Sequence, residues 1–177
     1  MKKMRLFAVL LLAISMFSFI PAEWVTIQSP EGKFRMAFPR QPQLTEETGD
    51  GGITMNVFRY DVGKFKDDNI VYSVSFADHP DSIIHSDYKD AIIDAFFSDA
   101  IRKAIKKENG SKISEIKINY KEYPGRRLKI GIMAGKGMLY MQYYLVNSRL
   151  YVLQVSCDKE HDNNAAIEKF LGSFTLM

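Results

Sequence analysis

One long segment of the chain has a helical hydrophobic period, and this constrains the fold more than any other feature. Within residues 86–107, apolar side chains recur about every 3.6 positions, as in an α-helix with one apolar face. Acidic residues gather near its start and basic residues near its end, which complements the helix dipole. Asn109-Gly110 marks the end. We predict a long helix packed on a sheet through one broad apolar face, which consists of a stripe of Tyr88, Ile92, Phe96, Ala100 and Ala104 with Ile93, Phe97, Ile101 and Ile105 beside it.

The segments before this helix alternate in side-chain character and predict strands. Residues 24–28 and 33–38 are joined by Ser29-Pro30-Glu31-Gly32, whose residue types are typical of a type I turn, so they predict a hairpin. Pro39 and Pro42 lack the N–H that strand pairing needs, and the polar residues after them are expected to form a loop that carries Glu46-Glu47. Two further strands are predicted at residues 54–62 and 70–77.

The segments after the helix predict four strands and a second helix. The strands are expected at residues 116–120, 128–132, 138–146 and 150–157, with Tyr123-Pro124-Gly125 as the turn between the first two. The last two are almost wholly apolar, as in central strands covered on both faces. Residues 162–171 predict a short helix and residues 173–176 a final strand. We therefore predict an α+β fold, a mainly antiparallel sheet packed by one long and one short helix.

The N-terminal residues are typical of an export signal. Lys2, Lys3 and Arg5 precede an apolar segment at residues 6–20, which ends at Pro21-Ala22. That segment is shorter than the ~20 residues that a helix needs to cross a bilayer. We predict a cleaved signal peptide at residues 1–22, one domain at residues 23–177 and a periplasmic or secreted location. An uncleaved anchor is the alternative, because Ile20 is not the small residue that a cleavage site prefers.

The charge of the chain argues against a nucleic-acid-binding protein, and its cysteine content excludes a protein stabilised by intramolecular disulfides. Three of the 24 basic residues lie in the predicted signal and none of the 21 acidic ones do, so the mature chain is formally neutral. It lacks the basic excess that nucleic-acid binding requires. Cys157 is the single cysteine, so no intramolecular disulfide can form. We interpret Cys157 as a small buried apolar residue of a strand.

No motif in the sequence assigns a catalytic, cofactor-binding or metal-binding residue. His79, His85 and His161 lack the short spacing with which one element presents two imidazoles to a metal ion. The loop that holds His79 and His85 also carries acidic side chains, so a metal-binding module there is an alternative. A second alternative is a hydrolase-type enzyme whose site is assembled from distant residues such as these histidines and carboxylates.

The tyrosines of the last strands are the remaining feature of note. Alternation sends Tyr143 to the sheet face opposite Tyr144, with Tyr140 and Tyr151 nearby. A tyrosine combines a large apolar body with a polar tip, which suits both a core position and a binding surface. We expect each to be a core residue with its hydroxyl at the rim.

Several structural positions resemble the PsbP-like / Mog-type α/β/α sandwich superfamily. They run in this order: Trp24, Gly32-Lys33-Phe34, Phe38-Pro39, Arg149-Leu150-Tyr151-Val152-Leu153 and Phe170-Leu171-Gly172-Ser173-Phe174. The resemblance implies a sandwich fold and a binding or assembly role without catalysis. We expect an exported, non-enzymatic module of the cell envelope, with no cofactor. Its partner would be an envelope protein or a small ligand, bound on a sheet face or at the rim between helix and sheet.

Overall fold

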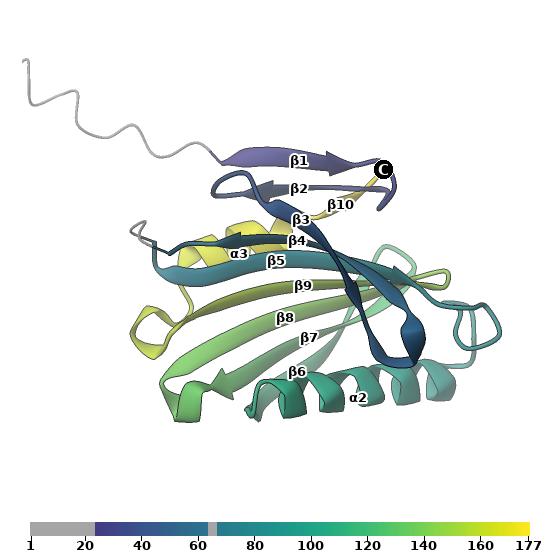
Figure 1. Ribbon diagram of the computed structural model, residues 1–177. Coiled ribbons are helices and arrows are strands. Elements are labelled where there is room, and N and C mark those ends of the chain that lie inside the picture. Colours follow the sequence, from purple (N-terminus) through teal and green to yellow (C-terminus); the bar gives the residue numbers. More distant parts are fainter. Residues whose placement is uncertain (1–23, 64–66) are drawn as a thin grey trace, which may run out of the picture.

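The computed structural model describes residues 24–63 and 67–177, and the predicted signal at residues 1–22 lies outside them. The described chain contains a seven-stranded sheet in which every neighbouring pair of strands is antiparallel (Figure 1). The predicted α+β class is confirmed. In spatial order the strands are β3 (Gln43–Thr48), β4 (Thr54–Asp61), β5 (Asn69–Asp78), β9 (Arg149–Asp158), β8 (Gly137–Val146), β7 (Tyr123–Ile132) and β6 (Ser111–Tyr120).

A second, smaller sheet lies against one face of the large one (Figure 1). It consists of β1 (Val25–Ser29), β2 (Phe34–Phe38) and β10 (Thr175–Leu176), with β2 in the middle. β1 and β2 form the predicted hairpin. Helix α3 (Ala165–Gly172) lies on the same face of the large sheet. We call this covered face the closed face. In the described part of the chain, short 3₁₀ turns connect other elements: η2 (Asp50–Gly52), η3 (Met133–Gly135) and η4 (Lys159–His161).

The long helix α2 (Asp90–Lys107) lies on the opposite face of the large sheet, which we call the open face (Figure 1). It buries Ile93, Phe97 and Ile101 against apolar residues of β7 and β8. The helix therefore packs on the sheet as predicted. It begins four residues later than the pattern indicated, because residues 85–88 form a turn in which Tyr88 N–H bonds to the carbonyl of His85, and Lys89 is the N-cap.

Two predictions about the strands are wrong in detail. Residues 43–48 form β3 rather than a loop, and all of its side chains are exposed, so it has no apolar alternation to reveal it. Pro124 and Gly125 belong to β7, and the turn lies at Lys121-Glu122. Pro124 is compatible with a strand here because pairing of β7 with β8 begins only at Gly125.

Aromatic side chains fill the closed face. Phe34 of β2 contacts the rings of Phe58, Phe76, Tyr151 and Phe174 at centroid distances between 5.7 and 6.1 Å. Edge-on and offset ring contacts of this kind add about 0.5–1.5 kcal/mol per pair to the free energy of burial. The small sheet and α3 thus seal this side of the large sheet.

No helix among residues 24–63 and 67–177 is both long enough and apolar enough to span a membrane. The prediction of a single domain at residues 23–177 stays a prediction.

Candidate functional site

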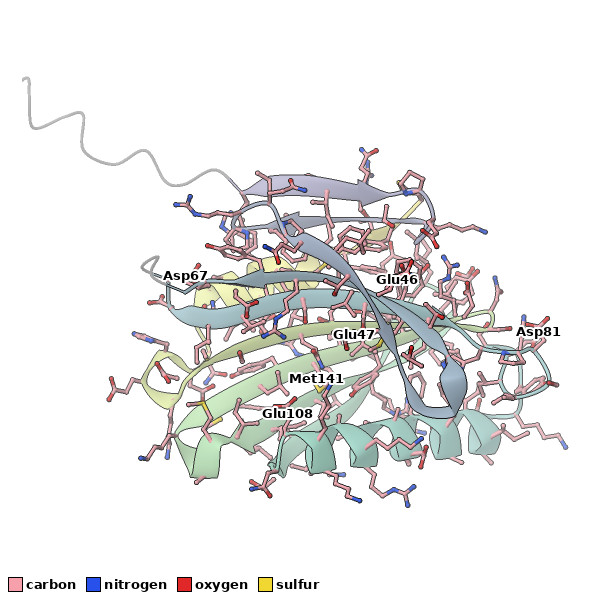
Figure 2. All side chains as sticks on the ribbon, in the orientation of Figure 1. Glu46, Glu47, Asp67, Asp81, Glu108 and Met141 are labelled. Carbon is pink, nitrogen blue, oxygen red and sulfur yellow. The ribbon has the colours of Figure 1, made fainter. Side chains whose placement is uncertain are left out.

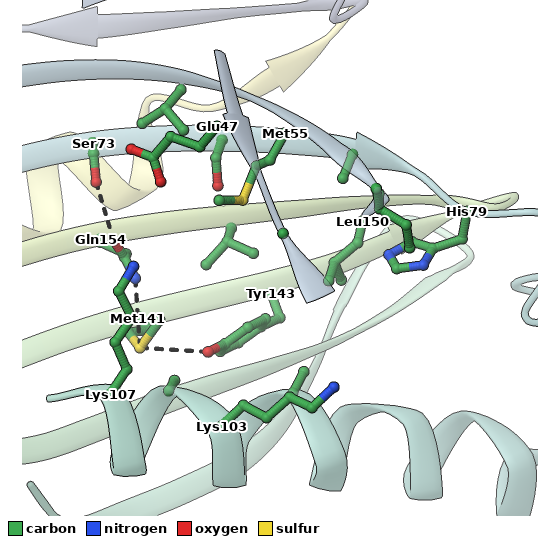
Figure 3. A pocket seen from close by; sticks show the side chains of 18 of the residues that line it. Glu47, Met55, Ser73, His79, Lys103, Lys107, Met141, Tyr143, Leu150 and Gln154 are labelled. Atoms are coloured by element: carbon green, nitrogen blue, oxygen red, sulfur yellow. Dashed lines mark hydrogen bonds between the residues drawn. The ribbon is translucent and has the colours of Figure 1, made fainter. Parts of the chain in front are cut away.

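A cavity of about 490 Å³ lies on the open face, between α2 and the half of the sheet that α2 does not cover (Figure 3). We call it the α2 groove. Its floor is formed by β5, β9 and β8, and its two walls by α2 and by the hairpin of β3 and β4, whose tip bends toward the helix in Figure 1. Pockets that bind small molecules commonly have volumes of about 300–1,000 Å³.

Small side chains create this space. Alternation along β5 points Ser73, Ser75 and Ala77 into the groove, while the larger Tyr72, Val74 and Phe76 point into the closed face. On the helix wall, Ala100 and Ala104 face the same space. The groove is therefore a consequence of side-chain size on two elements.

The apolar face of α2 is broader than the sheet surface that it covers. Phe96, Ala100 and Ala104 belong to the predicted stripe; they pack against the edge of the core and also line the groove. Ile92 of the same stripe is 46% exposed. The stripe that packs on the sheet is the neighbouring one, of Ile93, Phe97 and Ile101. The sequence thus indicated an apolar face without indicating that half of it stays uncovered.

Polar groups meet at one point on the floor of the groove. The Ser73 hydroxyl donates to Oε1 of Gln154 at 3.2 Å, and Nε2 of Gln154 points at Sδ of Met141 at 3.9 Å (Figure 3). The hydroxyl of Tyr143 also donates to Met141 Sδ, at 3.4 Å. A thioether sulfur is a weak acceptor. Two donors therefore share one poor acceptor inside the cavity.

Tyr143 is almost completely buried, with 2% of its surface exposed. Burial raises the pKa of its hydroxyl above the ordinary value, so the group stays protonated and remains a donor at neutral pH. Tyr140, Tyr144 and Tyr151 are buried in the closed face. The predicted separation of Tyr143 from Tyr144 is confirmed.

The charged residues of the groove stand at its rim. Lys103 lies 3.0 Å from Asp99, whose pKa is lowered by its hydrogen bonds with Lys103 and Arg102. Arg59 is held by both carboxylate oxygens of Asp61. These pairs are exposed, so each contributes little to stability.

His79 lines the end of the groove where α2 begins. Its ring stands edge-on to Phe96 with a centroid distance of 5.1 Å. Desolvation by burial is the main cause that lowers the pKa of His79; nearby Asp78 opposes it and Lys103 adds to it. His79 is therefore neutral at pH 7.

The structure does not bring the three histidines together. His85 bonds to Asp87, and the closest approach of His161 to Asp68 is 3.7 Å. The loops near Asp68 and near His85 lie at opposite ends of the sheet, where Figure 2 labels Asp67 and Asp81. In the described chain, no group of three or more His, Cys, Asp or Glu residues is arranged to hold a metal ion.

The acidic side chains around His79 and His85 are engaged in structural contacts. Asp78 receives two hydrogen bonds of 2.6 Å from Arg149, and the Ser148 hydroxyl donates to Asp81. Hydrogen bonding to Arg149 is the main reason that the pKa of Asp78 is lowered. These contacts fasten the loop to the turn between β8 and β9.

Two other residues singled out in the sequence lie elsewhere. Cys157 is buried in the closed face, and burial raises the pKa of its thiol to about 11, so the reactive thiolate is scarce at neutral pH. Glu47 stands on the β3 wall of the groove.

Ser73, Met141 and Gln154 were not identified from the sequence as site residues. The available signal was modest: Gln154 interrupts an apolar strand, and Ser73 and Ser75 share one strand face. Polar residues on one side of an otherwise apolar central strand indicate a face that is not packed against core. The signal could not say that α2 would stand beside these residues and leave a cavity.

A polar cleft of about 480 Å³ lies between α2 and β6. Its buried member is Arg126, which stacks on Phe97 at 4.8 Å and bonds to Asp94. Lys117 bonds to the same carboxylate at 2.7 Å. These contacts tie the helix to β6 and β7.

No protein-family model matches the chain. No curated protein sequence matches it significantly. The comparison with solved structures does find related folds. The solution structure of cyanobacterial PsbP (CyanoP) from Synechocystis sp. PCC 6803 superposes with a TM-score of 0.56 at 11% sequence identity, over 90% of this chain and 96% of that one.

Two further structures are less similar. A crystal structure of PA94 from Pseudomonas aeruginosa, described as a protein of unknown function and putative regulator, has a TM-score of 0.43 at 11% identity, over 78% of this chain and 85% of that one. A crystal structure from Bacteroides thetaiotaomicron VPI-5482 has a TM-score of 0.37 at 12% identity, over 86% of this chain and 48% of that one. The assignment of the fold rests on the superposition on CyanoP. This chain has a PsbP-like fold.

Proposed function

We propose that this protein is an exported, non-catalytic binding module of the cell envelope, and that the α2 groove is its binding site. The observation that carries the proposal is the cavity of about 490 Å³, which is walled by apolar residues of α2 and has a few polar groups on its floor. A largely apolar pocket with few convergent polar groups is the usual form of a small-molecule site.

The polar contacts in the groove support binding over catalysis. A serine becomes nucleophilic when a neighbouring base accepts its proton. The hydroxyl of Ser73 instead donates to the amide oxygen of Gln154, which is not a base. His79 is packed edge-on against Phe96. These contacts leave the Ser73 hydroxyl without an activating base, and they suit hydrogen bonding to a ligand better than catalysis.

Export is supported by the charged start and apolar segment of residues 1–22. The test is to express the full-length chain with a C-terminal tag in a Gram-negative host, fractionate the cells and determine the N-terminus by mass spectrometry. We expect periplasmic protein that begins at Glu23. Recovery in the cytoplasm would contradict export, and an intact N-terminus in the membrane fraction would support the anchor.

Occupancy of the groove can be tested with the fluorescent apolar probe N-phenyl-1-naphthylamine, added to the protein recovered from that experiment. We expect saturable binding that Ala100→Phe weakens strongly, because the new ring projects from the helix wall into the groove and occupies space that the probe needs. Ala95→Phe is the matched control, since Ala95 is an exposed residue of the same helix outside the groove. Equal probe binding by Ala100→Phe and the unchanged protein would refute the proposed site.

A further inference from the structure

We infer that the α2 groove binds a fatty acid: a single acyl chain that lies along the groove, with its carboxylate at the polar point on the floor, where Tyr143 and Gln154 supply donors, and with Lys107 at the same end. This inference rests on the proposed binding function and names the ligand class. It is carried by three features of the groove, namely its donors, its nearby cation and its apolar length.

The first feature is the pair of poorly satisfied donors. The Tyr143 hydroxyl and the Gln154 amide both point at Met141 Sδ, at 3.4 and 3.9 Å. A charged oxygen is a much stronger acceptor than a thioether, and hydrogen bonds to ionised groups are about twice as strong as neutral ones. A ligand carboxylate placed at this point would gain bonds that the protein alone makes only weakly. The site therefore selects a ligand that brings acceptors.

The second feature is the charge at that end of the groove. Lys107 lines the cavity from the last turn of α2, and Figure 3 shows it at the same end as Gln154 and Ser73. Arg59 and Lys103, the other long cations of the rim, are each held by an aspartate of this chain. Glu47 of the β3 wall also lies toward this end in Figure 3, and its charge acts on Arg59. A head group that bonds to the donors on the floor has Lys107 as its counter-ion. An anionic head fits this position better than a cationic one.

The third feature is the apolar track that leads away from the polar point. Val152 and Leu150 follow Gln154 on the same face of β9, and Ala100 and Phe96 face them from the helix. Figure 3 places Leu150 and His79 at the end opposite Lys107. From Phe96 to Lys107 the helix wall is about 16 Å long, at 1.5 Å per residue. This track suits an extended hydrocarbon chain.

The geometry also argues against the two nearest alternatives. A cationic amphiphile would find Glu47 and Asp99 on the rim, but Asp99 is already paired with Lys103 and the floor offers it donors instead of acceptors. An uncharged chain such as an alcohol or an ester would use the apolar track and leave Lys107 without a role. Both alternatives become arms of the test.

The test is displacement of N-phenyl-1-naphthylamine by four ligands with the same chain: palmitate, methyl palmitate, hexadecanol and hexadecylamine. We expect palmitate to displace the probe at the lowest concentration, with roughly ten-fold tighter binding than hexadecanol, as one charge-assisted hydrogen bond provides. Lys107→Met should remove most of that ratio, and Tyr143→Phe should reduce it. Lys106→Met, a change on the same turn outside the groove, should leave the ratio unchanged.

The outcomes separate this inference from the proposed function. If the probe binds but palmitate is no tighter than hexadecanol, or Lys107→Met leaves the ratio unchanged, the groove is a site for a different ligand class and the inference is overturned. If the probe does not bind at all, the proposed function itself fails. Far-ultraviolet circular dichroism and thermal melting of Tyr143→Phe show whether its effect comes from lost folding; should that variant be unfolded, the palmitate to hexadecanol ratio in Lys107→Met decides.

Discussion

The two faces of the large sheet are built from the same strands and are finished in different ways. On the closed face, large rings from the small sheet, the large sheet and α3 interlock, and Phe34, Phe38 and Phe170 have no exposed surface. On the open face, a single helix covers only part of the strands, and a mixture of small, polar and apolar residues lines the groove that remains. The comparison teaches that one side of the sheet is packed as a core, while the other side keeps the groove that we propose as the binding site.

Alternation makes this division possible. Each strand of the sheet sends successive side chains to opposite faces, so a residue can change on the open face without touching the closed core. Leu153 packs within the closed face, while its neighbours Val152 and Gln154 line the groove. We therefore expect substitutions on the two faces to differ both in cost and in the property that they change.

Truncation of one ring on each face gives the largest expected contrast. Phe34→Ala removes a fully buried ring from the closed face and should lower the free energy of unfolding by about 3–5 kcal/mol. Phe96→Ala, on the groove wall, should lower it by about 1 kcal/mol. Urea unfolding followed by circular dichroism measures both. Equal losses would contradict the division between the faces.

Addition of atoms provides the reverse contrast. A methyl group on Gly125 would clash with the carbonyl oxygen of Tyr143 and would lie 2.8 Å from the ring of Tyr144, so Gly125→Ala should cost about 1–3 kcal/mol. Ala100→Phe adds a whole ring to the open face and should change the melting temperature by far less, since the groove has room for it. Thermal melting decides, and a larger loss for Ala100→Phe would refute the space assigned to the groove.

The start of α3 tests a polar contact of the closed face. Asn164 accepts hydrogen bonds from the backbone N–H groups of Ala166 and Ile167, and its Nδ2 donates to Asn69 at 2.9 Å. Asn164→Ala should cost about 1–2 kcal/mol, because a helix cap and a partner of a buried amide are lost together. Asn164→Asp keeps the cap but cannot donate to Asn69. The free energy of unfolding of Asn164→Asp, measured with urea, should therefore lie between those of the unchanged protein and Asn164→Ala. An unchanged stability in Asn164→Ala would contradict the role of this contact.

The pH dependence of His79 is the smallest expected effect and belongs to the open face. Its folded-state pKa lies below the ordinary value of 6.5, so between these two values the unfolded chain binds the proton more readily. Stability should therefore fall as the pH is lowered through this window and should be independent of His79 above it. His79→Gln should lack this component. Urea midpoints at pH 8, 6 and 5 measure the difference, and a larger acid loss in the variant would reverse the assignment.

Local pattern predicted most of the elements and the hairpin of β1 and β2, but not the order of the strands in the two sheets. The helical period, the alternating strands and the apolar runs that became β8 and β9 were all readable, because each depends on neighbours in sequence. β3 was not readable, since its side chains are all exposed and show no apolar alternation; among the described strands it lies at the sheet edge and pairs with β4. The placement of β1, β2 and β10 in a separate small sheet depends on contacts between the two ends of the chain.

The groove could be predicted only in part. The idea that binding occurs at the rim between helix and sheet agrees with the position of the cavity. However, its polar point depends on Ser73, Met141 and Gln154, which come from three strands and meet through strand order rather than through spacing. His79 was considered from the sequence as a metal ligand or catalytic residue, and in the structure it packs edge-on against Phe96 in the groove.

The pairing of β10 with β2 determines when this molecule can finish folding. Thr175 and Arg35 are 140 positions apart and bond to each other, so the layer that seals the aromatic core lacks a strand until the last few amino acids are available. Contacts between such distant positions form slowly, because closing the long intervening segment costs conformational entropy before the contacts can stabilise the fold. The aromatic core of the closed face therefore remains incompletely covered until residues 175–176 have paired with β2.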